Sequence, residues 1–77
     1  MPTVFRGASW KITMYFRDHP PPHVHIVTSS RHEAQLRLSD LSVFAGHVPP
    51  SVLAQTRAWA AANHDLLREK WSALHPD

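Results

Sequence analysis

The sequence predicts an α+β fold: a small curved antiparallel sheet of three to five strands, with one long C-terminal helix packed on one face. Two patterns predict it. Alternating apolar and polar residues recur within residues 3–46, and apolar residues three or four apart fill about residues 51–74. The chain of 77 residues is expected to form a single domain, residues 1–77, because it is too short for a second hydrophobic core.

The strands are predicted by their two-residue period, since successive side chains of a strand point to opposite faces of the sheet. The clearest case begins at Trp10, where apolar residues alternate with Lys11, Thr13 and Tyr15. Turn-forming residues separate the shorter stretches that follow. The expected strands are residues 3–6, 10–16, 23–27, 33–38 and 41–45.

A single helix of about 24 residues is expected to follow Pro49 and Pro50, with Ser51 as its N-cap. At 1.5 Å per residue it would be roughly 36 Å long, which exceeds the width of a small sheet. The helix must therefore either overhang the sheet or kink near Asn63. An overhang carrying Trp71 and Leu74 would form a surface for a partner.

Composition excludes several classes of protein. The chain has no cysteine, which rules out disulfides, thiolate zinc sites and iron–sulfur clusters, and it fits a reducing cytoplasm. We identify no signal peptide and no apolar run near the ~20 residues of a membrane span, so a cytoplasmic protein without membrane contact is expected. The net charge is only +2, which is far from the basic footprint of a DNA-binding domain but compatible with a phosphate-bearing ligand.

The residues best suited to chemistry form one block, in which Asp18 and His19 precede three prolines and His23 and His25 follow them. Residues two apart in a strand share a face and lie about 6.6 Å apart, so both of the latter imidazoles can reach one ion. The prolines hold the preceding loop stiff. Imidazoles with a carboxylate suit zinc or nickel, which predicts a divalent metal site of His19, His23, His25 and Asp18.

The same block also permits chemistry without a metal. His23 and His25, assisted by Asp18, could act as acid and base at a phosphodiester, while Arg17 and Arg31 hold its charged oxygens. The sequence leaves open whether the protein is an enzyme. If it is one, metal-dependent or histidine acid–base phosphodiester hydrolysis is the expected reaction.

A purely structural role is the third interpretation of the block. Asp18 would then cap the turn, while His19 and His23 would bond backbone groups near the prolines. His64, on the helix, is either a further metal ligand or a partly buried side chain with its own hydrogen bond. The spacing of the remaining histidines predicts no functional role for them; they are His32, His47 and His75.

The block Asp-His-x-Pro-Pro-His-x-His at residues 18–25, with Glu33, Gly46 and Trp59, resembles the bacterial family known as domain of unknown function 4160. The resemblance spans nearly the whole chain. It implies a short stand-alone protein encoded beside a small protein partner, in the manner of a toxin–antitoxin pair, and it implies no established activity. By resemblance the signature residues are Asp18, His19, His23 and His25, with Glu33 and His64 as lesser positions.

Three functions remain open from the sequence. The preferred one is a toxin–antitoxin-like component whose histidine-rich segment contacts RNA or another phosphate ligand. The second is a metal-binding protein that uses the His-x-His block with zinc or nickel. The third is a non-catalytic interaction module that binds its partner through Trp71 and Leu74. A homodimer is also expected, because pairing would cover the open edges of a small sheet.

Overall fold

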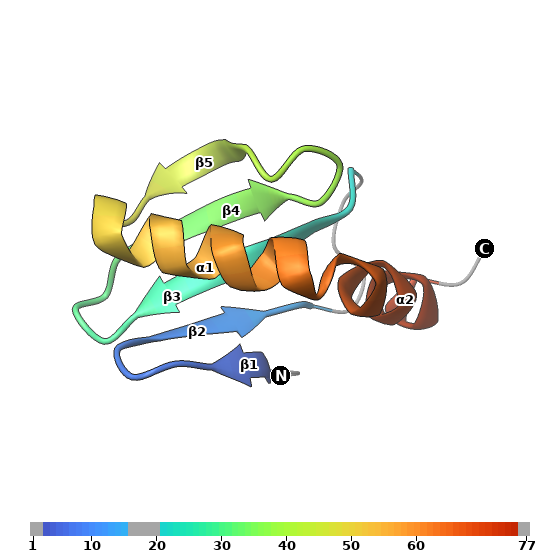
Figure 1. Ribbon diagram of the computed structural model, residues 1–77, viewed down its shortest axis with the longest axis horizontal. Helices are drawn as coiled ribbons and strands as arrows, with labels where there is room; N and C mark the ends of the chain where they lie inside the picture. The colour runs from blue at the N-terminus through green and yellow to red at the C-terminus, as the bar shows by residue number, and fades with distance from the viewer. Residues whose placement is uncertain (1–2, 16–20, 76–77) are drawn as a thin grey trace.

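The computed structural model describes residues 3–15 and 21–75 of the chain. It confirms the α+β prediction, with a five-stranded antiparallel sheet crossed on one face by a helix (Figure 1). A second helix turns away at the end of the sheet. The elements are β1 (Thr3–Arg6), β2 (Trp10–Thr13), β3 (His23–Thr28), β4 (Glu33–Arg37), β5 (Val43–His47), α1 (Pro50–Ala62) and α2 (His64–Leu74).

The sheet is a meander, in which each strand pairs antiparallel with the next in the order β1-β2-β3-β4-β5. The register shifts once in β1, between Thr3 and Phe5, and once between β4 and β5. Such bulges increase the local twist and curve a sheet. At Gly46 the φ angle is +77°, and a Cβ atom would collide with the backbone carbonyl of Glu33, so only glycine fits this approach of β5 to β4.

The core lies between the sheet and α1. The alternation predicted from the sequence sends one set of side chains from β2, β3 and β4 toward this helix, where they are buried with residues from both helices. Each fully buried aliphatic side chain contributes about 1.5–3 kcal/mol. We call this surface of the sheet the helix face; its buried core residues on the three central strands are Trp10, Ile12, Val24, Ile26, Ala34 and Leu36.

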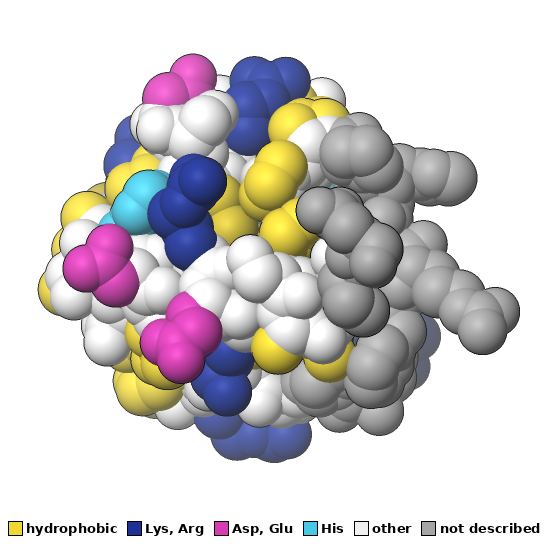
Figure 2. Space-filling model, turned by 90° about the vertical axis from the view of Figure 1, so that its right-hand side faces the viewer, with side chains coloured by type: hydrophobic (Ala, Val, Ile, Leu, Met, Phe, Trp, Pro, Cys, Tyr) yellow, Lys and Arg dark blue, Asp and Glu magenta, His cyan; other side chains and the backbone are white. Residues whose placement is uncertain are grey.

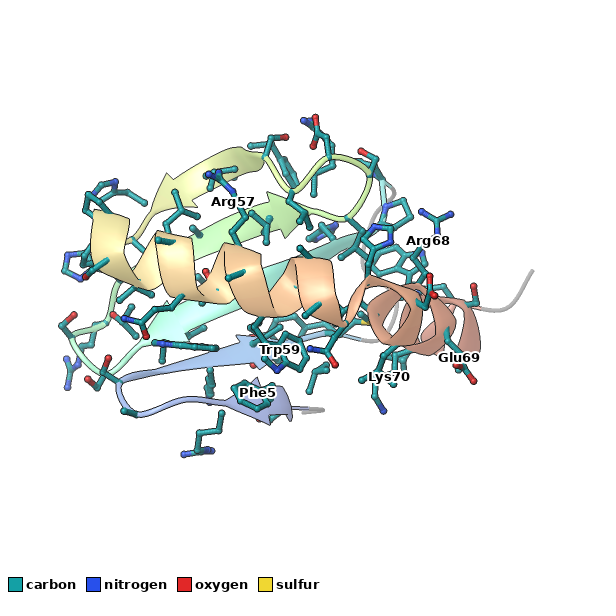
Figure 3. The ribbon with its side chains drawn as sticks, viewed as in Figure 1. Phe5, Arg57, Trp59, Arg68, Glu69 and Lys70 are labelled. Atoms are coloured by element: carbon teal, nitrogen blue, oxygen red, sulfur yellow. The ribbon has the colours of Figure 1, made fainter. Side chains whose placement is uncertain are left out.

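The edge strand β1 is fastened to α1 by aromatic contacts. Phe5 of β1 stacks on Trp59 of α1 with ring centroids 4.6 Å apart, and the two labelled rings lie against each other in Figure 3. The indole Nε1 of Trp10 donates a hydrogen bond to Gln55 Oε1 of α1 at 3.0 Å. These contacts fix the position of α1 across the sheet.

The expected long helix is broken at Asn63, which lies between the end of α1 and the start of α2. Both the backbone N–H and the side-chain Nδ2 of Asn63 donate to the Trp59 carbonyl, at 3.0 and 2.9 Å. The chain therefore kinks at Asn63, and α2 follows the end of the sheet (Figure 1). As a result Trp71 and Leu74 are half-buried and pack against the core.

Several boundaries differ from the sequence prediction. Strand β2 ends at Thr13, before the predicted end at residue 16, while β3 extends one residue further, to Thr28, and β4 ends one residue earlier, at Arg37. Helix α1 begins one residue early, at Pro50, with Pro49 at the N-cap position instead of Ser51, because proline already has helical φ and needs no N–H in the first turn. Strand β5 covers Val43–His47 rather than residues 41–45, because residues 38–40 form a turn and Leu41, which follows it, has a φ of 61°.

Within the described residues, neither helix is both long enough and apolar enough to cross a membrane.

Candidate functional site

The surface of the sheet turned away from α1 carries most of the polar strand residues. Cross-strand pairing sets His25 between Thr13 of β2 and Gln35 of β4, and it sets His23 beside Arg37. These residues share one side of the sheet because residues directly opposite one another point the same way. We call this surface the histidine face; its members are Arg6, Lys11, Thr13, His23, His25, Val27, Glu33, Gln35, Arg37 and His47.

His23 and His25 form a buried pair on β3. Their ring centroids are 5.2 Å apart, and the two residues are only 3% and 8% exposed. Nδ1 of His23 donates to the Pro21 carbonyl oxygen at 2.7 Å, and Nδ1 of His25 donates to Glu33 Oε2 at 2.9 Å. Because a carbonyl and a carboxylate can only accept, these bonds place a proton on each Nδ1, and a neutral ring then carries its lone pair on Nε2.

Other rings surround the pair. Tyr15 meets His25 edge-on with centroids 4.6 Å apart, and Phe44 of β5 meets His23 edge-on at 5.2 Å. From α2, the ring of Trp71 lies 5.4 Å from that of His23. The kink at Asn63 makes this last contact possible. We call the group the histidine–aromatic cluster; its members are Tyr15, His23, His25, Phe44, Trp71 and His75, which stacks on Trp71 at 3.7 Å.

The cluster borders a hollow at the α2 end of the molecule. It has a volume of about 130 Å³ and is lined by Pro22, Arg68, Trp71 and Ser72. Figure 2 views the molecule from this end and shows hydrophobic side chains exposed between Lys and Arg side chains. Of the cluster members, Trp71 lines this hollow.

The structure brings together only some of the residues predicted from the sequence. Arg17, Asp18 and His19 lie outside the described residues. Arg31 is exposed in the turn between β3 and β4, and no contact among the described residues joins it to the histidine pair. Nε2 of His64 donates to the Leu38 carbonyl, so this nitrogen links α2 to the segment after β4.

Several contacts of the site were not predicted. Glu33 was named only as a lesser position by resemblance, and its hydrogen bond with His25 had a detectable signal, because a turn at residues 28–31 sets it diagonally across the hairpin from His25. Trp71 was expected to face a partner, and its contact with His23 depends on the direction that α2 takes after the kink. No local pattern marks Phe44 as a neighbour of His23, since that contact joins β5 to β3. His75 joins the cluster only through Trp71, four residues before it.

The geometry of the pair suits one metal ion. Two imidazoles bound through Nε2 to a tetrahedral zinc ion, with Zn–N bonds of about 2.0–2.1 Å, have ring centroids about 5 Å apart. The observed separation is 5.2 Å. Among residues 3–15 and 21–75, no three His, Cys, Asp or Glu side chains form a group that could hold a metal. Within the described residues, His23 and His25 alone are therefore fewer than the three protein ligands of a typical catalytic zinc site.

Comparison with known proteins identifies a family. A family model described as "Domain of unknown function (DUF4160)" matches residues 9–72, which include β2 to β5, α1 and most of α2. No curated protein and no solved structure shows a significant match to the chain.

Proposed function

The chain belongs to the DUF4160 family, to which no activity is assigned, and we propose that its histidine face binds a divalent metal ion through His23 and His25. The observation that carries the proposal is the closeness of the two buried rings, each of which is held by a hydrogen bond at Nδ1. Each imidazole has its Nδ1–H bonded to an acceptor, and the ring centroids have the separation of two ligands on one ion.

The hydrogen-bond partners are those that metal-binding histidines use. Such histidines almost always donate their second ring N–H to a carboxylate, a backbone carbonyl or water, which fixes the tautomer and the ring orientation. Here Glu33 supplies the carboxylate for His25, and Pro21 supplies the carbonyl for His23. The rings are therefore oriented before an ion arrives, and little side-chain entropy is lost on binding.

The donor set favours zinc or nickel. Imidazole nitrogen suits these ions, whereas magnesium and calcium prefer carboxylate, carbonyl and water oxygens. Because the chain has no cysteine, the remaining ligands must be imidazole, carboxylate or water. Asp18 and His19, which precede the pair in the sequence, are the ligands we propose to complete the set.

The contact with RNA, the toxin–antitoxin-like role and the small protein partner stay predictions. Direct contact of a nucleic acid with His23 and His25 is less favoured than metal binding, because the two residues are only 3% and 8% exposed. Binding of a partner through Trp71 and Leu74 and the formation of a homodimer likewise remain predictions. Metal-dependent phosphodiester hydrolysis would combine metal binding with contact to RNA, and the ion would then act as the Lewis acid.

The test is metal analysis of protein purified without a histidine tag, followed by calorimetric titration with zinc and nickel. We expect an ion to bind more tightly than about 100 μM, which corresponds to roughly −5.5 kcal/mol. His23→Ala and His25→Ala should each weaken binding at least tenfold. The matched control is His47→Ala, an exposed histidine of β5 on the same face. Absence of binding at this threshold, or an equal loss in the control, would contradict the proposal.

A further inference from the structure

Two cations lie directly opposite each other at the far end of the histidine face. Arg6 of β1 pairs with Lys11 of β2 in the register of the sheet. Like charges in this position destabilise a pair of strands. Among the described residues, neither side chain forms an ion pair or a hydrogen bond. The fold therefore keeps an unfavourable pair of positive charges without an acidic neighbour.

The acid that shares this row of the sheet does not neutralise the pair. Val27 of β3 separates Lys11 from Glu33 of β4, and the Glu33 carboxylate accepts its hydrogen bond from His25. The basic pair is thus left for a ligand that brings its own negative charge.

A pocket of about 180 Å³ opens beside the pair, between the β1–β2 turn and the β3–β4 turn. Arg6 and Lys11 line it together with Ser9 and Ser29, both of which are exposed serines. The backbone N–H of Ser29 donates to the Ser9 carbonyl at 2.9 Å and holds the two turns together. Two cationic side chains and two hydroxyl groups are therefore gathered on one small, preformed concavity.

We propose that this pocket binds a phosphate group. Arg and Lys make short, charge-assisted hydrogen bonds with phosphate oxygens, and hydroxyls supply neutral donors. The volume is below the roughly 300–1,000 Å³ of pockets that enclose a whole organic ligand, which favours a phosphate group over a larger molecule. The site lies at the turn end of the sheet, opposite the histidine–aromatic cluster, and does not depend on metal binding there.

The test is a titration of the full chain with inorganic phosphate at constant ionic strength, followed by amide chemical shifts and by calorimetry. We expect shifts at residues 6–11 and 27–29, with a dissociation constant near 1 mM or tighter. The double variant Arg6→Gln/Lys11→Gln should bind at least tenfold more weakly. The control is Arg57→Gln/Lys70→Gln, which removes the same charge from α1 and α2, where Figure 3 labels both residues.

The melting temperature separates loss of binding from loss of fold. Removal of a like-charge pair should leave the Arg6→Gln/Lys11→Gln variant at least as stable as the native protein. The proposal is overturned if 20 mM phosphate shifts none of these amides, or if the control double variant loses affinity to the same extent.

A second titration, with a short single-stranded RNA, distinguishes the sources of the phosphate. If the RNA binds more than tenfold more tightly than inorganic phosphate and the double variant loses that gain, the pocket takes a backbone phosphodiester. If the two affinities are alike, it takes a free phosphate or a monoester. Either result supports the pocket.

Discussion

The two faces of the sheet differ in what their buried residues do. On the helix face the core residues Ile12, Val24, Ile26 and Leu36 are fully buried and apolar, so burial alone stabilises them. On the histidine face, buried residues are polar, and burial of an imidazole is unfavourable unless its N–H groups find partners. The helix face is thus stabilised by apolar burial alone, whereas the buried polar groups of the histidine face depend on hydrogen bonds.

The largest effect is expected from truncation of the helix face. Leu36→Ala removes a fully buried side chain and should lower the free energy of unfolding by about 2–5 kcal/mol, through lost transfer energy and a residual cavity. Urea denaturation measures this change in the free energy of unfolding. The control is Gln35→Ala, the preceding residue on the histidine face, which should cost less than about 1 kcal/mol. An equal loss of free energy of unfolding in both variants would contradict the claim that the helix face, and not the histidine face, stabilises the fold by apolar burial.

The next effect concerns binding rather than stability. Glu33→Ala removes the acceptor of the His25 Nδ1–H bond and should weaken zinc binding about 10- to 100-fold, or roughly 1.4–2.7 kcal/mol. Glu33→Gln keeps an acceptor oxygen and should restore part of the affinity. The control is Glu69→Ala on α2, labelled in Figure 3. If Glu33→Ala binds zinc as tightly as the control does, Glu33 does not orient a ligand.

A smaller effect compares two fully buried threonines. Among the described residues, Thr13 Oγ1 on the histidine face has no hydrogen-bond partner, whereas Thr56 Oγ1 on α1 donates to the Val52 carbonyl at 2.9 Å. Thr13→Val should therefore raise the free energy of unfolding by about 1 kcal/mol, and Thr56→Val should give no gain. Urea denaturation of both variants tests the comparison, and a loss of stability in Thr13→Val would contradict it.

The smallest effect lies outside both faces, in the turn between β4 and β5. Hydrogen bonds from the Ser42 hydroxyl and backbone N–H hold the pKa of Asp40 below its usual value of 3.8. Because the pKa of Asp40 is lower in the folded chain than in the unfolded chain, its ionised carboxylate stabilises the fold at pH values above the unfolded pKa. This stabilisation is lost as the pH falls through the folded pKa. Carboxyl NMR titration should show the pKa of Asp40 rising in Ser42→Ala; an unchanged pKa would refute the stated cause.

The sequence predicted the helix face better than the histidine face. Alternation in β2, β3 and β4 identified the apolar residues directed toward the helix, because a two-residue period is a local property. The same period correctly set His23 and His25 on one face. Their neighbours Phe44 and Trp71 could not be predicted, since those contacts require the register of β5 and the angle of α2. The kink at Asn63 was foreseen only as one of two alternatives.

The order of the strands also bears on how the chain folds. Each strand pairs with its neighbour in the sequence, so the sheet can form by successive hairpins with short loop closures. The contacts of longest range join the helices to the rest of the chain, such as Trp10 with Gln55 and Leu38 with His64. Proteins rich in local contacts fold quickly. We therefore expect a fast-forming meander and a later docking of α1 and α2, which completes the core and, through Trp71, the surroundings of His23.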